Sequence, residues 1–66
     1  MAPTSFTPEV KRILKNHGCR FYRKGKGDHE IWHSPLTHRK ITVDGKILSR
    51  HTANETLKQA GIAKSF

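Results

Sequence analysis

The chain has 66 residues, of which 13 are Lys or Arg, five are Asp or Glu and five are His, so its formal net charge is +8 and its pI about 10.3. This length accommodates one domain, 1–66. The chain has one cysteine, so we expect no internal disulfide. It has no apolar run near ~18 residues and no signal-peptide segment, so we expect a cytoplasmic protein without a membrane span. The surplus of positive charge favours polyanionic partners, with nucleic acid first and an acidic protein surface second.

A helix is predicted over 8–17, after a disordered tail at 1–5. Thr7 is expected to be its N-cap, and Gly18 follows its last turn as a left-handed C-cap. Apolar side chains three and four positions apart form one stripe along this helix, as is typical of a face that packs on a core. They are Val10, Ile13 and Leu14.

Three strands are predicted after this helix, over 19–24, 29–33 and 39–43. The connections between them are short, which favours an antiparallel sheet. Because strand side chains alternate between faces, His29, Ile31 and His33 share one face, and Glu30 and Trp32 share the other. Of the three aromatic residues in the first two strands, we expect at least two in the core. These residues are Phe21, Tyr22 and Trp32.

A tight turn at Asp44 and Gly45 allows a brief fourth strand over 46–48. The spacing of Thr52 and Glu55 is that of a capping box, which predicts the start of a second helix that ends at Gly61. The expected fold is therefore α+β, with the order αβββα, a three-stranded antiparallel sheet and both helices on one face of that sheet.

The loop over 24–28 connects the first two strands and leads directly to His29. It contains two lysines and two glycines, and His29 is the group in this stretch that exchanges protons near neutral pH. A cationic loop that ends in a histidine suits chemistry on the phosphates of a polyanion. An ordinary solvated hairpin loop with a structural histidine is the alternative interpretation.

Histidine and cysteine spacings do not predict a metal site or another cofactor. His29 and His33 would lie ~13 Å apart along one strand, too far to share an ion. The closest other pair is His17 with Cys19, which lacks a matching second pair. Cys19 has the strand position of a small buried apolar residue rather than that of a nucleophile.

The basic residues extend over both helices, two strands and the loop, and an ordinary surface would mix both signs of charge. This imbalance favours nucleic-acid binding over a merely solvated surface. The residues from which we expect RNA contacts are Arg23, Lys24, Lys26, Arg39, Lys40 and Arg50.

Three motifs in the right order resemble those of the HicA toxins, small mRNA interferases of type II toxin–antitoxin modules. The first is Asn16-His17-Gly18 followed by Phe21 and Arg23. The second is Gly27-Asp28-His29-Glu30-Ile31-Trp32, where family members typically carry Gly-Ser-His-His-Ile-Phe. The third is Leu57-Lys58-Gln59-Ala60-Gly61-Ile62, and the resemblance covers about 6–62.

The resemblance implies a fold like that of double-stranded-RNA-binding domains, ribonuclease activity and a HicB-like antitoxin partner. The catalytic histidine of the family corresponds to His29 and its supporting glycine to Gly27. Asp28 stands at the usual serine and Glu30 at the usual second histidine. Their carboxylates would repel an RNA phosphate, but on a strand both side chains would point away from that of His29.

The predicted function is therefore that of a metal-independent endoribonuclease acting on mRNA, with His29 as general acid or base and with Gly27 and Asp28 in its supporting loop. The free toxin is expected to be a monomer that does not bind membranes. A non-catalytic RNA-binding module of the same fold is the alternative. A small protein whose basic face docks onto an acidic partner is a third possibility.

Overall fold

Two helices and three strands follow one another in the predicted order in a computed structural model, which describes residues 5–63 and 65–66. Their bounds are α1 Thr7–Asn16, β1 Arg20–Lys24, β2 Glu30–Ser34, β3 Arg39–Val43 and α2 Arg50–Gln59. Of the expected tail at 1–5, residues 1–4 lie outside the described part, and Ser5 is half-buried. Within the described residues, neither helix is long and apolar enough to cross a membrane.

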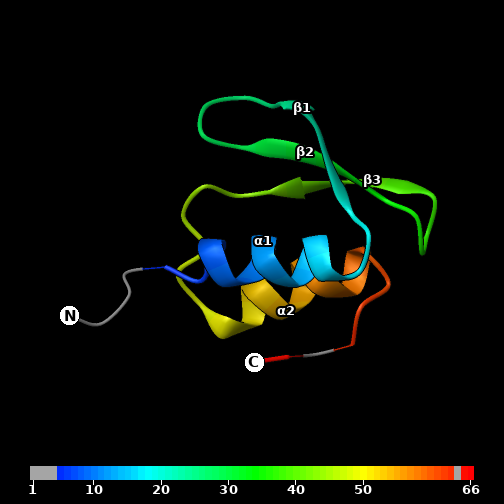
Figure 1. Ribbon diagram of the computed structural model, residues 1–66. Coiled ribbons are helices and arrows are strands. Elements are labelled where there is room, and N and C mark those ends of the chain that lie inside the picture. Colours follow the sequence, from blue (N-terminus) through cyan, green and yellow to red (C-terminus); the bar gives the residue numbers. More distant parts are fainter. Residues whose placement is uncertain (1–4, 64) are drawn as a thin grey trace.

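The strands form one antiparallel sheet in the order β1-β2-β3, and both helices lie on the same face of it (Figure 1). The predicted αβββα fold is confirmed. The alternation within β2 is confirmed as well, because Trp32 and Ser34 are buried on the helix side whereas His33 is exposed on the other side. The sheet therefore has one covered face and one open face.

One cluster of apolar side chains fills the space between the helices and the covered face of the sheet. Its members are Val10, Leu14, Cys19, Trp32, Ile41, Val43, Ile47, Ala53, Leu57, Ala60 and Ile62. Cys19 takes the predicted role of a small buried residue and is a free thiol. The apolar stripe of α1 contributes Val10 and Leu14, both fully buried, while Ile13 packs at the edge of the cluster.

The start of α1 is tied to the segment between β3 and α2. The hydroxyl of Thr7 donates to the carbonyl of Asp44 (3.0 Å) and accepts from the amide of Ile47 (3.0 Å), while the amide of Phe6 donates to the carbonyl of Ile47 (2.6 Å). Thr7 is therefore not the N-cap, a position held by Phe6. The brief fourth strand that the sequence allows over 46–48 does not form, because the backbone groups of Ile47 pair with the start of α1 instead of with the sheet.

The second helix begins about one turn earlier than the sequence predicted. Ser49, in an extended conformation, is its N-cap, and its hydroxyl accepts a hydrogen bond from the amide of Thr52 (3.1 Å). The capping box predicted at Thr52 and Glu55 is wrong because Thr52 already lies inside the helix. Sequence spacing alone does not distinguish two hydroxyl residues three positions apart, both of which can cap.

Only one of the three aromatic residues of β1 and β2 is in the core, so this prediction is wrong. Trp32 is 2% exposed, whereas Phe21 and Tyr22 are 50% and 53% exposed. All five residues of β1 are exposed because this edge strand extends beyond the core, and its register is interrupted by a bulge between Phe21 and Arg23. Phe21 still contacts the edge of the Trp32 ring, with centroids 6.4 Å apart.

Candidate functional site

The loop between β1 and β2 is closed by its own backbone. The amide of Gly25 donates to the carbonyl of His29 (2.9 Å), and the amide of His29 donates to the carbonyl of Lys26 (3.1 Å). Gly27 is the second residue of the inner turn and has φ +63°, a conformation that costs other residues free energy. His29, which directly precedes β2, is therefore held in place although it lies beside an exposed loop.

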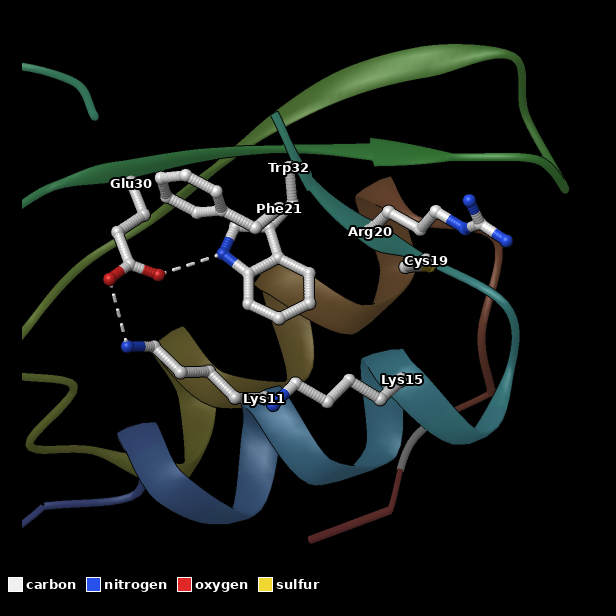
Figure 2. A pocket seen from close by; sticks show the side chains of 7 residues that line it. All are labelled: Lys11, Lys15, Cys19, Arg20, Phe21, Glu30 and Trp32. Atoms are coloured by element: carbon white, nitrogen blue, oxygen red, sulfur yellow. Dashed lines mark hydrogen bonds and ion pairs between the residues drawn. The ribbon is translucent and has the colours of Figure 1, made fainter. Parts of the chain in front are cut away.

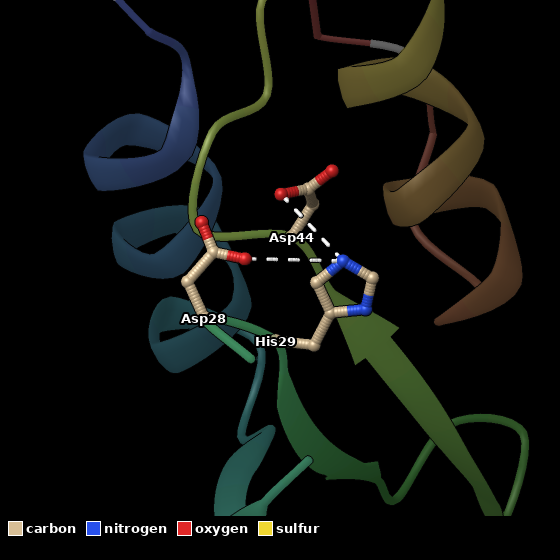
Figure 3. A group of neighbouring side chains, drawn as sticks. All are labelled: Asp28, His29 and Asp44. Atoms are coloured by element: carbon tan, nitrogen blue, oxygen red, sulfur yellow. Dashed lines mark ion pairs between the residues drawn. The ribbon is translucent and has the colours of Figure 1, made fainter. Parts of the chain in front are cut away.

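Two carboxylates flank the imidazole of His29 (Figure 3). Its Nε2 lies 3.9 Å from an oxygen of Asp28 and 3.8 Å from an oxygen of Asp44, while the side chain remains 43% exposed. Both distances exceed that of a hydrogen bond but allow electrostatic attraction when the ring is protonated. Nδ1 points away from both carboxylates (Figure 3) and is the ring nitrogen left for another molecule.

The two carboxylates that replace family residues behave differently. Asp28 was predicted to point away from His29, and this is wrong because Asp28 lies in the turn rather than on a strand, where side chains need not alternate. The prediction for Glu30 is confirmed. Its side chain is on the covered face of the sheet, where it pairs with Lys11 at 3.1 Å.

Asp44 was missed by sequence reasoning, although a signal for it existed. Glu30 pairs with Val43 across β2 and β3, so the residue before Glu30 and the residue after Val43 lie opposite each other. Extending the antiparallel register by one position would have placed Asp44 beside His29. The carboxylate of Asp44 is also held locally, because it accepts a hydrogen bond from the amide of Lys46 (2.8 Å).

The turn after β3 touches the loop after β1 at Gly45. A Cβ atom at this position would lie 2.7 Å from the carbonyl oxygen of Asp28 and 2.8 Å from its Cβ. Real Cβ contacts are never this short, and the obstacle is partly backbone. Gly45 therefore allows the two turns to meet, and their contact positions Asp28 and Asp44 around His29.

The ligand atoms of Asp28, His29 and Asp44 all lie within 4.8 Å of one another, so these residues could hold a metal ion. The spacing of histidines and cysteine in the sequence gives no sign of this group, because two of its three members are aspartates. Two carboxylates with one imidazole form a donor set that suits several divalent metals. His17 is not part of such a group, since its Nδ1 lies 2.9 Å from the carbonyl of Ile13.

The cations predicted to contact RNA do not form one cluster. Arg23 and Lys40 have the strand register of the open face, where Arg23 is opposite half-buried Ile31 and Lys40 is opposite exposed His33. Lys24 and Lys26 lie at the end of β1 and in the loop beside His29. Arg39 pairs with Ser34 at the other end of the sheet from His29. Arg50 is the first residue of α2.

A hollow of about 440 Å³ lies between α1 and the sheet (Figure 2). Its lining consists of Lys11, Lys15, Cys19, Arg20, Phe21, Glu30 and Trp32. One carboxylate oxygen of Glu30 accepts from the indole nitrogen of Trp32 (2.9 Å), and the other faces the ammonium of Lys11. The polar groups of Glu30, Trp32 and Lys11 are therefore paired with one another, and His29 does not line the hollow. We interpret the hollow as a packing feature that joins α1 to the sheet.

Comparison with known proteins gives one match. The family model described as HicA toxin of bacterial toxin-antitoxin matches residues 7–62, which include both helices, the sheet and the whole cluster around His29. Neither the curated proteins nor the solved structures contain a match to the chain.

Gly45→Ala should disable the site although it removes no charged residue. The new methyl group would push the backbone of Asp28 away, and with it His29. We expect loss of any activity that depends on His29. Gly27→Ala serves as the comparison. A Cβ atom at Gly27 would meet nothing within 4 Å, so only the cost of the positive φ disfavours an alanine there. An active Gly45→Ala protein would show that contact between the turns does not position the histidine.

Glu30→Gln should reduce stability at neutral pH but not in acid. The hydrogen bond from Trp32, more than the nearby Lys11, holds the pKa of Glu30 below its usual value, against the opposing effect of partial burial. The charged carboxylate therefore stabilises the fold above the unfolded pKa of ~4.3, and this contribution is lost as the pH falls through the lower folded value.

Urea denaturation of both proteins measures this effect. We expect the wild type to be more stable by about 1 kcal/mol at pH 7, a difference that should shrink once the pH is brought well below the unfolded pKa of ~4.3. A difference that stays the same at neutral and at acidic pH would show that the charge of Glu30 does not contribute.

Proposed function

The chain belongs to the HicA toxin family of bacterial toxin–antitoxin systems, and we propose that it acts as an endoribonuclease that cleaves mRNA in the cytoplasm. The observation that supports this most directly is the placement of His29. It is half-exposed, held by two backbone hydrogen bonds, and adjacent to a loop with two lysines. It also stands at the position of the catalytic histidine in the family motif.

The proposed reaction uses the 2′-hydroxyl of the RNA as nucleophile. Its oxygen attacks the adjacent phosphorus, the bond from phosphorus to the 5′ oxygen breaks, and one proton moves from the 2′ oxygen to the departing 5′ oxygen. The products are a 2′,3′-cyclic phosphate and a 5′-hydroxyl. His29 either accepts the first proton or donates the second, as general base or general acid.

The surroundings of His29 support a division of work between its two nitrogens. Asp28 and Asp44 lie 3.9 and 3.8 Å from Nε2 and favour the ring orientation in which Nε2 faces them, as the acidic partner of a catalytic histidine commonly does. Nδ1 is then the nitrogen that meets the RNA. Lys24 and Lys26, together with Arg23, would stabilise the extra negative charge on the phosphate in the transition state.

Membership of a toxin–antitoxin family implies an antitoxin partner. We expect an acidic, HicB-like protein that covers His29 and the loop over 24–28, because this would block the RNA and oppose the surplus of positive charge. A non-catalytic RNA-binding protein is the second candidate function. The specific observation in its favour is the pair of carboxylates beside Nε2. They repel a phosphate that approaches His29, which would hinder cleavage while leaving RNA contacts elsewhere on the protein intact.

His29→Ala should stay folded and lose RNA cleavage. The side chain is half-exposed and is not part of the core, so its removal costs little packing. General acid–base catalysis contributes ~10²–10⁴-fold to rates, and we expect a loss of at least this size in the initial rate on a fluorescent RNA.

His51→Ala is the matched control, since His51 is an exposed histidine on α2. It should cleave RNA at the wild-type rate, and circular dichroism should show all three proteins folded. A His29→Ala protein as fast as His51→Ala would exclude His29 as the catalytic group.

Asp28→Ser restores the residue typical of the family and should improve RNA binding. A carboxylate ~4 Å from a bound phosphate is repelled by about 1 kcal/mol in a water-like dielectric, so we expect KM to fall roughly fivefold. Steady-state kinetics at low salt measure this. Glu30→Gln is a suitable comparison, because it removes a carboxylate on the covered face and should leave KM unchanged. A raised KM for Asp28→Ser would mean that this carboxylate helps the substrate to bind.

A further inference from the structure

Among the described strand residues, the open face of the sheet carries cations and an aromatic ring but no carboxylate, while Asp28 and Asp44 lie beyond the end of the strands, around His29. Only one acidic residue of the chain falls within a strand, Glu30, and it points to the covered face toward Lys11. We call this surface the open face. The strand residues that the register assigns to it, together with Tyr22 at the bulge, are Arg20, Tyr22, Arg23, Ile31, His33, Lys40 and Thr42. Arg20, at the start of β1, also borders the hollow between α1 and the sheet.

Three basic residues stand side by side across this face. Arg20 pairs with His33 on β2, and His33 pairs with Lys40 on β3. Arg20 and Lys40 therefore lie on either side of His33, about two strand spacings (~9–10 Å) apart, and like charges on the same face of a sheet repel each other. No described carboxylate pairs with Arg20 or Lys40 in this basic row. A bound polyanion would supply the missing negative charge.

Tyr22 adds a flat ring to the same face. It is 53% exposed, and the ammonium of Lys40 lies 4.3 Å from its ring centroid. The ammonium therefore lies over one face of the ring, so a base that stacks on Tyr22 would use the other face or displace Lys40. An exposed aromatic ring next to cations is the arrangement that binds a single strand, because a base stacks on the ring while the cations contact neighbouring phosphates.

We infer that the open face binds single-stranded RNA and guides it toward His29. A base would stack near Tyr22, and the phosphates on either side would contact Arg20 and Lys40. His33 lies four residues after His29, ~13 Å along β2, so a strand that follows β2 passes from the basic row to the candidate catalytic group. An acidic protein segment fits the charges equally well, but it would not use the exposed ring.

This inference rests on the proposed function only for the choice of RNA, and binding can be measured without cleavage. The probe is a short, fluorescent single-stranded 2′-O-methyl RNA, which lacks the nucleophilic hydroxyl. Fluorescence anisotropy at several salt concentrations gives its Kd for wild-type protein and for Arg20→Ala, Lys40→Ala and Tyr22→Leu. Lys58→Ala, an exposed cation on α2, is the matched control for loss of charge.

We expect Arg20→Ala and Lys40→Ala each to reduce the log–log salt slope by about 0.7, the value for one phosphate contact on a single strand. Tyr22→Leu should weaken binding roughly 5- to 100-fold with little change in slope. Lys58→Ala should match the wild type. Melting temperatures should be unchanged or raised for the variants of the basic row, because removal of a like charge relieves the sheet.

Variants of the open face that bind the RNA as Lys58→Ala does would overturn the inference. It also fails if these variants bind RNA normally but lose binding to polyglutamate, since the face would then dock acidic protein. Wild type that binds the methylated RNA through this face but leaves unmodified RNA intact supports the inference and contradicts the proposed endoribonuclease. Unmodified RNA that is cut by open-face variants with unchanged KM supports the endoribonuclease and contradicts the inference.

Discussion

The contact between two turns determines the geometry of this molecule's candidate site. Gly45, after β3, lies so close to Asp28 in the β1–β2 loop that a Cβ atom there would overlap with it. The turn after β3 is held by Thr7. Its hydroxyl forms hydrogen bonds with the backbone on both sides of Gly45, donating to the carbonyl of Asp44 and accepting from the amide of Ile47. The first turn of α1 therefore holds the segment that positions His29, although α1 itself contributes no side chain to the site.

The placement of a few carboxylates explains how the positive charge is distributed. Of the five acidic residues, Glu9 pairs with Arg12 and Glu30 pairs with Lys11, both on the helix side, and Glu55 is exposed on α2. The other two, Asp28 and Asp44, lie around His29. None of them lies among the strand residues of the open face. Its charge is available for a polyanion.

Much of the fold was predictable because it depends on local patterns. The stripe of α1, the alternation of β2 and the short connections depend only on neighbours in sequence, and all three predictions are confirmed. The errors concern groups whose partners are distant. Thr7 was expected to cap its own helix and instead binds the segment after β3, 37 residues away. Tyr22 was a core candidate but lies on an edge strand. His29 was identified from its loop, whereas Asp44 could be found only by extending the sheet register.

End-group analysis of RNA cut by the wild-type protein tests the proposed catalytic role of His29 most directly. The assay should be run in excess EDTA, because Asp28, His29 and Asp44 could also hold a metal ion. A histidine that moves protons for the 2′-hydroxyl should give 2′,3′-cyclic phosphate and 5′-hydroxyl ends, at the same rate with and without the chelator. Products with 5′-phosphate ends, or cleavage abolished by EDTA and restored by a divalent metal, would contradict this account and indicate that the cluster works as a metal centre.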